Sequence, residues 1–274
     1  MTSEQEFLQR LGRERAVWVT VQSHRGSVPR EVGAWMAVFA DDTVGTVGGG
    51  HLEWQAIAEA RERLQGQPGA PVLRYALGPS LGQCCGGEVH LAFECVSAQD
   101  VSRLQAGFAR MRQHWPTVAL FGGGHVGRAL VRLLGRLPMQ VRWIDSRDEI
   151  FPPQLPGHVT VEHSDPVQAA VAGLAAHSLV LVMSFSHAED LDVVAACLAR
   201  QRAQGDLRFI GLIGSQTKWA AFGHRLQARG FTTAELAQVT CPIGMAGIVG
   251  KEPEVIALAV AAQLLQVLGA PPDD

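Results

Sequence analysis

Apolar and polar residues alternate along much of the first hundred positions, as they do in strands that have one buried face. This alternation predicts strands at 16–23, 35–40, 43–47, 72–77 and 88–94. Apolar residues at helical spacing predict helices at 3–13, which opens with the capping-box pair Ser3 and Glu6, and at 51–64. We therefore expect a strand-rich α+β domain over residues 1–97.

After Pro116 the pattern changes to short apolar runs separated by longer amphipathic stretches. The runs predict strands at 118–121, 141–145, 159–162, 179–184 and 209–213, with helices at 125–136, 165–175, 188–204, 216–229 and 253–268. Strands that alternate with helices indicate a parallel, doubly wound sheet. The expected organisation is a helical connector at 98–116, followed by a Rossmann-like domain with a carboxyl-terminal helix at 117–274.

Composition narrows the classes of function. The formal net charge of −3 provides no overall basic field, so we expect no nucleic-acid partner. No run approaches the roughly 18 apolar residues that span a bilayer, and residues 1–15 lack a signal-peptide pattern, so we expect a cytoplasmic protein without a membrane partner. Five cysteines at irregular spacing indicate free thiols rather than a disulfide framework.

Gly122, Gly124 and Gly127 form a Gly-x-Gly-x-x-Gly turn between a predicted strand and a predicted helix that begins near His125. Asp145 ends the next strand about 20 residues later, where an acid binds ribose hydroxyls in dinucleotide-binding folds. The pattern predicts the fold but leaves the ligand open. NAD(P), another phosphate-bearing ligand and a purely structural turn are all compatible with it.

The sequence Gly-Gly-Gly-His occurs at 122–125 and also at 48–51, each time before a predicted helix. Glycine lets backbone N–H groups approach an anion at the helix start, so both turns are candidate anion sites. A third candidate combines Gly214 and Ser215 with Lys218, one turn into the following helix. A plain junction between strand and helix explains this third pattern equally well.

Three further segments of the first domain carry candidate chemistry. Ser27 and Arg30 lie in a polar loop, and a guanidinium recognises phosphate or a planar heterocycle. Glu53 falls in the first turn of its helix, where an acid is also favourable as a capping group. The segment 84–87 reads Cys-Cys-Gly-Gly, and a thiol beside glycine N–H groups can become nucleophilic or metal-binding.

In this order the segments resemble the XdhC/CoxI family of xanthine dehydrogenase accessory proteins, from about residue 15 to 265. The matching segments are GSVPR at 26–30 with GAWM at 33–36, GGGHLE at 48–53, LGQCCGG at 81–87, FGGGHVGRAL at 121–130, GLIGS at 211–215 and CPIG at 241–244. Many family members have Cys at the position of His51 and a single Cys before Gly86. We therefore align Cys85 with the family cysteine and treat Cys84 as additional.

The resemblance implies a molybdenum cofactor (molybdopterin) chaperone of purine catabolism, without catalytic turnover of its own. Such a protein binds the cofactor, supports its sulfuration by a cysteine desulfurase, and inserts it into the molybdenum-binding subunit of xanthine dehydrogenase. A homodimer is also expected for this family. The alternative is an NAD(P)-dependent oxidoreductase that uses the glycine turn, or a protein that binds another nucleotide there.

Together these arguments define one set of candidate residues. Cys85 is the candidate contact to molybdenum or sulfur. The candidate cofactor-binding residues are Ser27, Arg30, Gly49, Gly50, His51, Glu53, Cys84, Cys85, Gly86, Gly87, Gly122, Gly124, His125, Gly127, Asp145, Gly214, Ser215 and Lys218.

Overall fold

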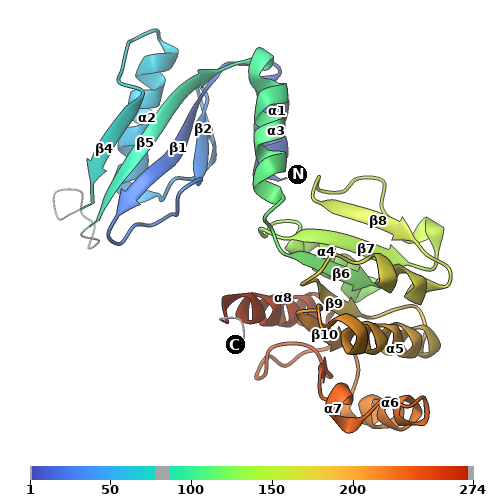
Figure 1. Ribbon diagram of the computed structural model, residues 1–274. Coiled ribbons are helices and arrows are strands. Elements are labelled where there is room, and N and C mark those ends of the chain that lie inside the picture. The colour runs from blue at the N-terminus through green and yellow to red at the C-terminus, as the bar shows by residue number, and fades with distance from the viewer. Residues whose placement is uncertain (1, 78–86, 271–274) are drawn as a thin grey trace. The chain divides into compact units, whose positions relative to one another are not determined.

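The computed structural model describes residues 2–77 and 87–270, which fold as two compact units, Met1–Arg110 and Met111–Asp274 (Figure 1). Among these residues the first unit holds an antiparallel sheet and the second a parallel one, so the predicted α+β region followed by a Rossmann-like region is confirmed. Each unit is described by itself.

The sheet of the first unit has the strand order β3-β2-β1-β5-β4. Its strands are β1 (Ala16–Arg25), β2 (Trp35–Val38), β3 (Thr43–Gly45), β4 (Val72–Ala76) and β5 (Glu88–Val96). Its helices are α1 (Ser3–Leu11), α2 (Gly50–Leu64) and α3 (Val101–Arg112), with α3 preceded by the 3₁₀ turn η2 (Ala98–Asp100). The long central pair β1 and β5 carries the polar loops of the candidate site at one end, because its register runs to Arg25 opposite Glu88.

Successive side chains of β1 point to opposite faces of the sheet, and different helices cover these two faces. Val17, Val19 and Val21 pack against the apolar side of α2 in one buried cluster. Ala16 and Trp18 face the other way, toward a cluster that α1 and α3 complete. The segment expected as a connector therefore contributes buried side chains, Leu104 and Phe108, to the core of the first unit.

The sheet of the second unit is parallel, with the order β11-β10-β9-β6-β7-β8. Its strands are β6 (Thr117–Phe121), β7 (Gln140–Asp145), β8 (Val159–His163), β9 (Leu179–Val182), β10 (Phe209–Leu212) and β11 (Val239–Thr240). The chain moves outward in one direction from β6 to β8 and in the other from β9 to β11. The carboxyl ends of β6 and β9 therefore meet at the switch point where such sheets bind ligands.

Both faces of this sheet are covered, which explains its continuous apolar strands. On one face α4 (His125–Leu134) and α8 (Pro253–Gly269) pack over Val118, Leu120 and their neighbours (Figure 1). The other face is covered by the elements η4 (Val167–Gly173), α5 (His187–Gln204), α6 (Gln216–Ala228) and α7 (Thr233–Leu236). The short 3₁₀ helix η3 (Asp148–Ile150) follows β7.

Some local features differ from the sequence prediction. The first capping box uses Thr2 and Gln5 rather than Ser3 and Glu6. The helix expected at 165–175 is the 3₁₀ helix η4, which buries Val167 and Ala170 at the i, i+3 spacing of that geometry, together with the adjacent Val171. The two-residue strand β11 and the single-turn helix α7 are too short to produce a periodic signal, and the sequence prediction lacks both.

Candidate functional site

The turn after β6 requires glycine at two of its three fingerprint positions. Gly122 has φ +120°, and a Cβ there would collide with the carbonyl oxygen of Met183. A Cβ on Gly127 would collide with the carbonyl oxygen of Gly122, because α4 passes directly over the turn. Gly124 differs: a Cβ there would meet nothing within 4 Å, so this residue faces open space at the start of α4.

Asp145 closes the turn from the end of β7. Its Oδ2 accepts hydrogen bonds from the Gly123 N–H (2.5 Å) and from Nη2 of Arg147 (2.9 Å). Its Oδ1 accepts from the Arg147 N–H (2.9 Å) and Nε (2.8 Å). Burial raises the pKa of Asp145, but the Arg147 guanidinium and the two backbone N–H groups outweigh it and hold the pKa below its usual value.

The ends of β7 and β9 are joined beside this turn by Glu189. Its Oε1 accepts from Ser146 Oγ (2.7 Å) and its Oε2 from the Phe185 N–H (3.0 Å). The Arg147 guanidinium lies 4.4 Å from the centre of the Phe185 ring, which is 65% exposed. An aromatic surface and a cation thus lie next to the glycine turn.

The predicted anion site at Gly214 and Lys218 is satisfied internally. The Ser215 hydroxyl caps α6 by accepting from the Lys218 N–H (3.2 Å). The Lys218 ammonium donates to Asp190 Oδ2 (2.6 Å) and to the Ile213 carbonyl (2.8 Å). These contacts support the alternative of a structural junction between strand and helix.

Asp190 is a buried residue that the sequence prediction missed. It is 2% exposed, and besides Lys218 it binds the Ser184 N–H through Oδ1 (2.7 Å). The pair therefore holds the ends of β9 and β10 together. The sequence shows only an acid in the first turn of α5, and an acid at that position most often lies on the surface, so it did not indicate a buried ion pair.

In the first unit Glu53 organises the other Gly-Gly-Gly-His turn. Its Oε2 accepts from Thr46 Oγ1 (2.5 Å) and from the N–H groups of Val47 and Gly49 (both 3.1 Å). This carboxylate reaches back from the first turn of α2, as its capping interpretation expected. Its contacts favour a structural role for Glu53 in shaping residues 48–50.

The structure brings the motifs of the first unit together. A Cβ on Gly48 would collide with the ring of Pro29, and one on Gly87 with the carbonyl oxygen of Ser27. The loop with exposed Ser27 and Arg30 thus contacts both other segments. The predicted site residues Cys84, Cys85 and Gly86 lie outside the described residues.

Two aromatic residues extend the first-unit cluster. The His51 ring stacks on Trp54, with ring centroids 5.5 Å apart at 24°. Trp54 is 65% exposed on the same turn of α2. The sequence prediction named His51 but not Trp54, because a single exposed tryptophan in a helix carries no periodic signal.

The described cysteines of the second unit are poor candidates for a thiolate. Burial raises the pKa of Cys197 to about 12. Burial also raises the pKa of Cys241, although the Lys218 charge opposes this. In the described part of the chain, no group of three or more His, Cys, Asp or Glu side chains is arranged to hold a metal ion.

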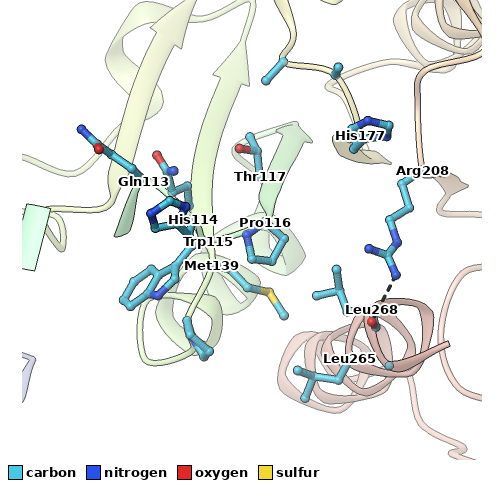
Figure 2. Close-up of a pocket in the computed structure, with 15 residues that line it drawn as sticks. Gln113, His114, Trp115, Pro116, Thr117, Met139, His177, Arg208, Leu265 and Leu268 are labelled. Atoms are coloured by element: carbon cyan, nitrogen blue, oxygen red, sulfur yellow. Dashed lines mark hydrogen bonds between the residues drawn. The ribbon is translucent and has the colours of Figure 1, made fainter. Parts of the chain in front are cut away.

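A hollow of about 880 Å³ lies at the opposite edge of the parallel sheet from the glycine turn. Figure 2 shows Thr117 at the amino end of β6 beside His114 and Trp115, with Arg208 donating to the Leu268 carbonyl at the end of α8. None of the predicted site residues lines it. Ligands of doubly wound sheets bind at the carboxyl edge, so we do not assign the hollow to the candidate site.

None of the helices in residues 2–77 and 87–270 is both long and apolar enough to cross a membrane.

Comparison with known families finds two matches that lie one in each unit. The sequence model described as the XdhC Rossmann domain matches residues 118–264, and that of the XdhC and CoxI family matches residues 10–76. A curated relative, the uncharacterized protein YqeB of Escherichia coli (strain K12), is 28% identical over 250 residues. The match covers 89% of this chain but only 42% of that relative, so the chain spans less than half of its length.

Among solved structures, one described as a xanthine dehydrogenase from Bacillus halodurans has a TM-score of 0.71 at 19% identity. The match covers 98% of this chain and 96% of that one, and at this identity it establishes a shared fold. The oxidoreductase ylbE from Lactococcus lactis matches with a TM-score of 0.38 at 13% identity, over 55% of this chain and 85% of its own. That score is too low to support an argument.

Proposed function

The chain belongs to the XdhC and CoxI family, and from this premise we propose that it is a maturation protein of xanthine dehydrogenase that binds the molybdenum cofactor as cargo. In this role it supports sulfuration of the cofactor and inserts it into the enzyme, without turnover of its own. The observation that carries the proposal is the pair of family matches, at 10–76 and 118–264, which fall on the two units holding the candidate residues.

The second unit offers a fitting place for the cofactor phosphate. Helix α4 has Gly124 at its N-cap and no side-chain hydrogen bond there, whereas Ser186 and Ser215 cap α5 and α6. The first N–H groups of α4, from His125 to Gly127, are therefore open to an anion. Open space in front of Gly124 leaves room for it.

Taken by itself, the first unit offers an alternative surface for a flat, polar heterocycle. Ser27 and Arg30 are exposed in the loop whose Pro29 contacts Gly48, and His51, which follows the turn at 48–50, stacks on Trp54. A guanidinium and aromatic faces are the partners that a planar pterin ring prefers. Cys85 remains our candidate for contact with the molybdenum or its sulfur ligand, since a soft metal prefers thiolate.

The proposed partners follow from the same premise. They are the molybdenum-binding subunit of xanthine dehydrogenase, which receives the cargo, and a cysteine desulfurase, which supplies sulfur. We also propose a homodimer, which sedimentation velocity would test directly.

An NAD(P)-dependent oxidoreductase is the competing proposal, favoured by the turn at 122–127. The contacts of Asp145 weigh against it, because the carboxylate that would hold the ribose is already occupied by Gly123 and Arg147. Unchanged melting temperature at millimolar NAD(H) and NADP(H) is the expected result if this alternative is wrong.

The experiment that tests the chaperone proposal is anaerobic purification from a molybdate-supplied host, followed by mass spectrometry of what co-purifies. We expect a molybdopterin species with the wild-type chain and much less with Gly124→Val, whose side chain would fill the open space before α4. Xanthine dehydrogenase activity in a strain deleted for this chain provides the second readout. Absence of the pterin together with undiminished activity would reject the proposal.

A further inference from the structure

Arg147 lies between two groups that a nucleotide would need. Its guanidinium and backbone N–H bind Asp145, and the same guanidinium packs on the Phe185 ring at 4.4 Å. The side chain of Arg147 is 35% exposed, whereas that of Asp145 is 1% exposed. The arginine therefore covers the acid on the side that faces solvent, while the Gly123 N–H binds it from the glycine turn.

The hydrogen-bond capacity of Asp145 is used completely. An ionised carboxylate has two oxygens with about four lone-pair positions. Each oxygen of Asp145 accepts two hydrogen bonds, three of the four coming from Arg147. A ribose diol could bind this acid only after the guanidinium has been displaced.

Displacing the guanidinium is unfavourable for two reasons. The guanidinium and the carboxylate carry opposite charges, and two of its N–H groups donate one to each carboxylate oxygen, an attraction between charges that neutral hydroxyls do not supply. Removal of the guanidinium would also leave a buried carboxylate with no compensating charge. The packing on Phe185, whose N–H is held by Glu189, fixes the guanidinium further.

We propose that Arg147 is a specificity-determining residue that excludes ribose-bearing nucleotides from the glycine turn by occupying Asp145. The turn then accepts a phosphate ester whose planar ring is not carried on a ribose diol, and the exposed Phe185 provides a surface for that ring. This inference deepens the proposed function and rests on it for the identity of the cargo. The exclusion of ribose stands on the contacts of Arg147 alone.

The test compares adenosine monophosphate with its 2′-deoxy analogue, which lacks one hydroxyl of the diol. Dissociation constants for both are measured by calorimetry on the wild type, Arg147→Ala and Arg147→Met. Loss of the arginine charge alters phosphate binding equally for both probes, so the ratio of the two constants isolates the diol. We expect a ratio near one for the wild type and a preference of about ten- to a hundredfold for the ribonucleotide in the variants.

Two controls separate this effect from a general disturbance. Arg142→Ala removes an ion-paired arginine within β7, three residues before Asp145, and should keep the wild-type ratio. Asp145→Asn in the Arg147→Ala background should return the ratio to about one. Circular dichroism establishes that each variant is folded, and Arg147→Met preserves an unbranched side chain against Phe185 if Arg147→Ala does not fold.

A wild type that already prefers the ribonucleotide would overturn the inference, as would a ratio that stays near one in the folded arginine variants. Failure of every variant to bind either probe also counts against it, because release of Asp145 would then have created no ribose site. The cargo experiment is independent of this ratio. If molybdopterin does not co-purify while the ratio changes as expected, the proposed function fails and the exclusion remains.

Discussion

At the scale of single residues, the glycines of the turn at 122–127 have different structural roles, although the Gly-x-Gly-x-x-Gly pattern does not distinguish them. Gly122 and Gly127 allow backbone segments to touch, while Gly124 borders open space with ordinary backbone angles. Substitution of Gly122 or Gly127 therefore tests the packing of the turn, whereas substitution of Gly124 tests access of a ligand to the start of α4.

We predict that Gly127→Ala destabilises the second unit by about 1–3 kcal/mol, because its Cβ would overlap the Gly122 carbonyl. Gly124→Ala should cost less, at most about 1 kcal/mol, because its Cβ meets no neighbour and only the lower preference for alanine at a helix N-cap remains. Urea unfolding measures both. Equal destabilisation by the two substitutions would contradict this assignment.

The lowered pKa of Asp145 predicts how the stability of the fold depends on pH. Its pKa in the folded protein lies below the unfolded value of about 3.9, so its contacts stabilise the fold above that value. This contribution is lost as the pH falls through the folded pKa. The stability difference between wild type and Asp145→Asn, measured by urea unfolding, should therefore be larger at pH 7 than at pH 3.

The matched control is Asp41→Asn in an exposed segment between β2 and β3. It should change stability little at either pH. A difference for Asp145→Asn that is constant from pH 7 to pH 3 would show that the ionised carboxylate contributes nothing.

At the scale of elements, ion pairs of unequal burial connect α5 with α6. Asp190 and Lys218 have side chains 3% and 12% exposed, whereas Asp192 and Arg229, at the far end of α6, are 38% and 42% exposed. Their donor–acceptor distances are nearly equal, 2.6 Å for Lys218–Asp190 and 2.7 Å for Arg229–Asp192. Burial is therefore the main variable between them.

We predict that Lys218→Met costs about 3–5 kcal/mol, because it leaves the Asp190 carboxylate buried without its cation. Asp190→Asn/Lys218→Met should cost less than Lys218→Met, since the amide still accepts from the Ser184 N–H and carries no charge. Arg229→Met, the exposed counterpart, should cost at most about 1 kcal/mol. The measurement is urea unfolding of the wild type, the two single variants and the double variant. A double variant less stable than Lys218→Met would contradict the argument.

At the scale of the whole molecule, the candidate residues are divided between two units that each have a core. The proposed delivery of cargo also depends on Cys85, which lies outside the described residues. We expect the contact to metal or sulfur at Cys85, which the family resemblance aligns with the family cysteine, and treat the neighbouring Cys84 as an additional thiol.

We predict that Cys85→Ala gives a folded chain with xanthine dehydrogenase maturation reduced about tenfold or more. Cys84→Ala is the matched comparison and should reduce maturation less than Cys85→Ala does. The measurement is dehydrogenase activity in a strain that carries each variant, with circular dichroism to establish folding. Full maturation by Cys85→Ala would reject the assignment.

Much of the candidate site followed from the sequence because glycine turns and capping residues act over a few positions. Gly127 and Glu53 are examples, since each is explained by contacts within a single strand–turn–helix unit, whereas the carbonyl that excludes a Cβ at Gly122 belongs to Met183, just after β9. Asp190 and Phe185 were missed because their importance depends on Lys218 and Arg147, which approach from other strands. The occupied state of Asp145 was missed for a different reason: Arg147 is only two residues away, but no spacing rule predicts that its side chain turns back onto the acid.

The sequence by itself determined the order of strands and helices, the parallel sheet of the second unit and the glycine turn at its centre. Those features follow from hydrophobic periodicity and backbone sterics, which are local. Only the tertiary structure decided which polar groups remain available to a ligand. It showed that Lys218 reaches Asp190 from a distant segment and that the Arg147 side chain turns back onto Asp145 while the start of α4 stays open. Side-chain conformation and long-range hydrogen bonds determine which charges are already satisfied, and neither is a property of local sequence pattern.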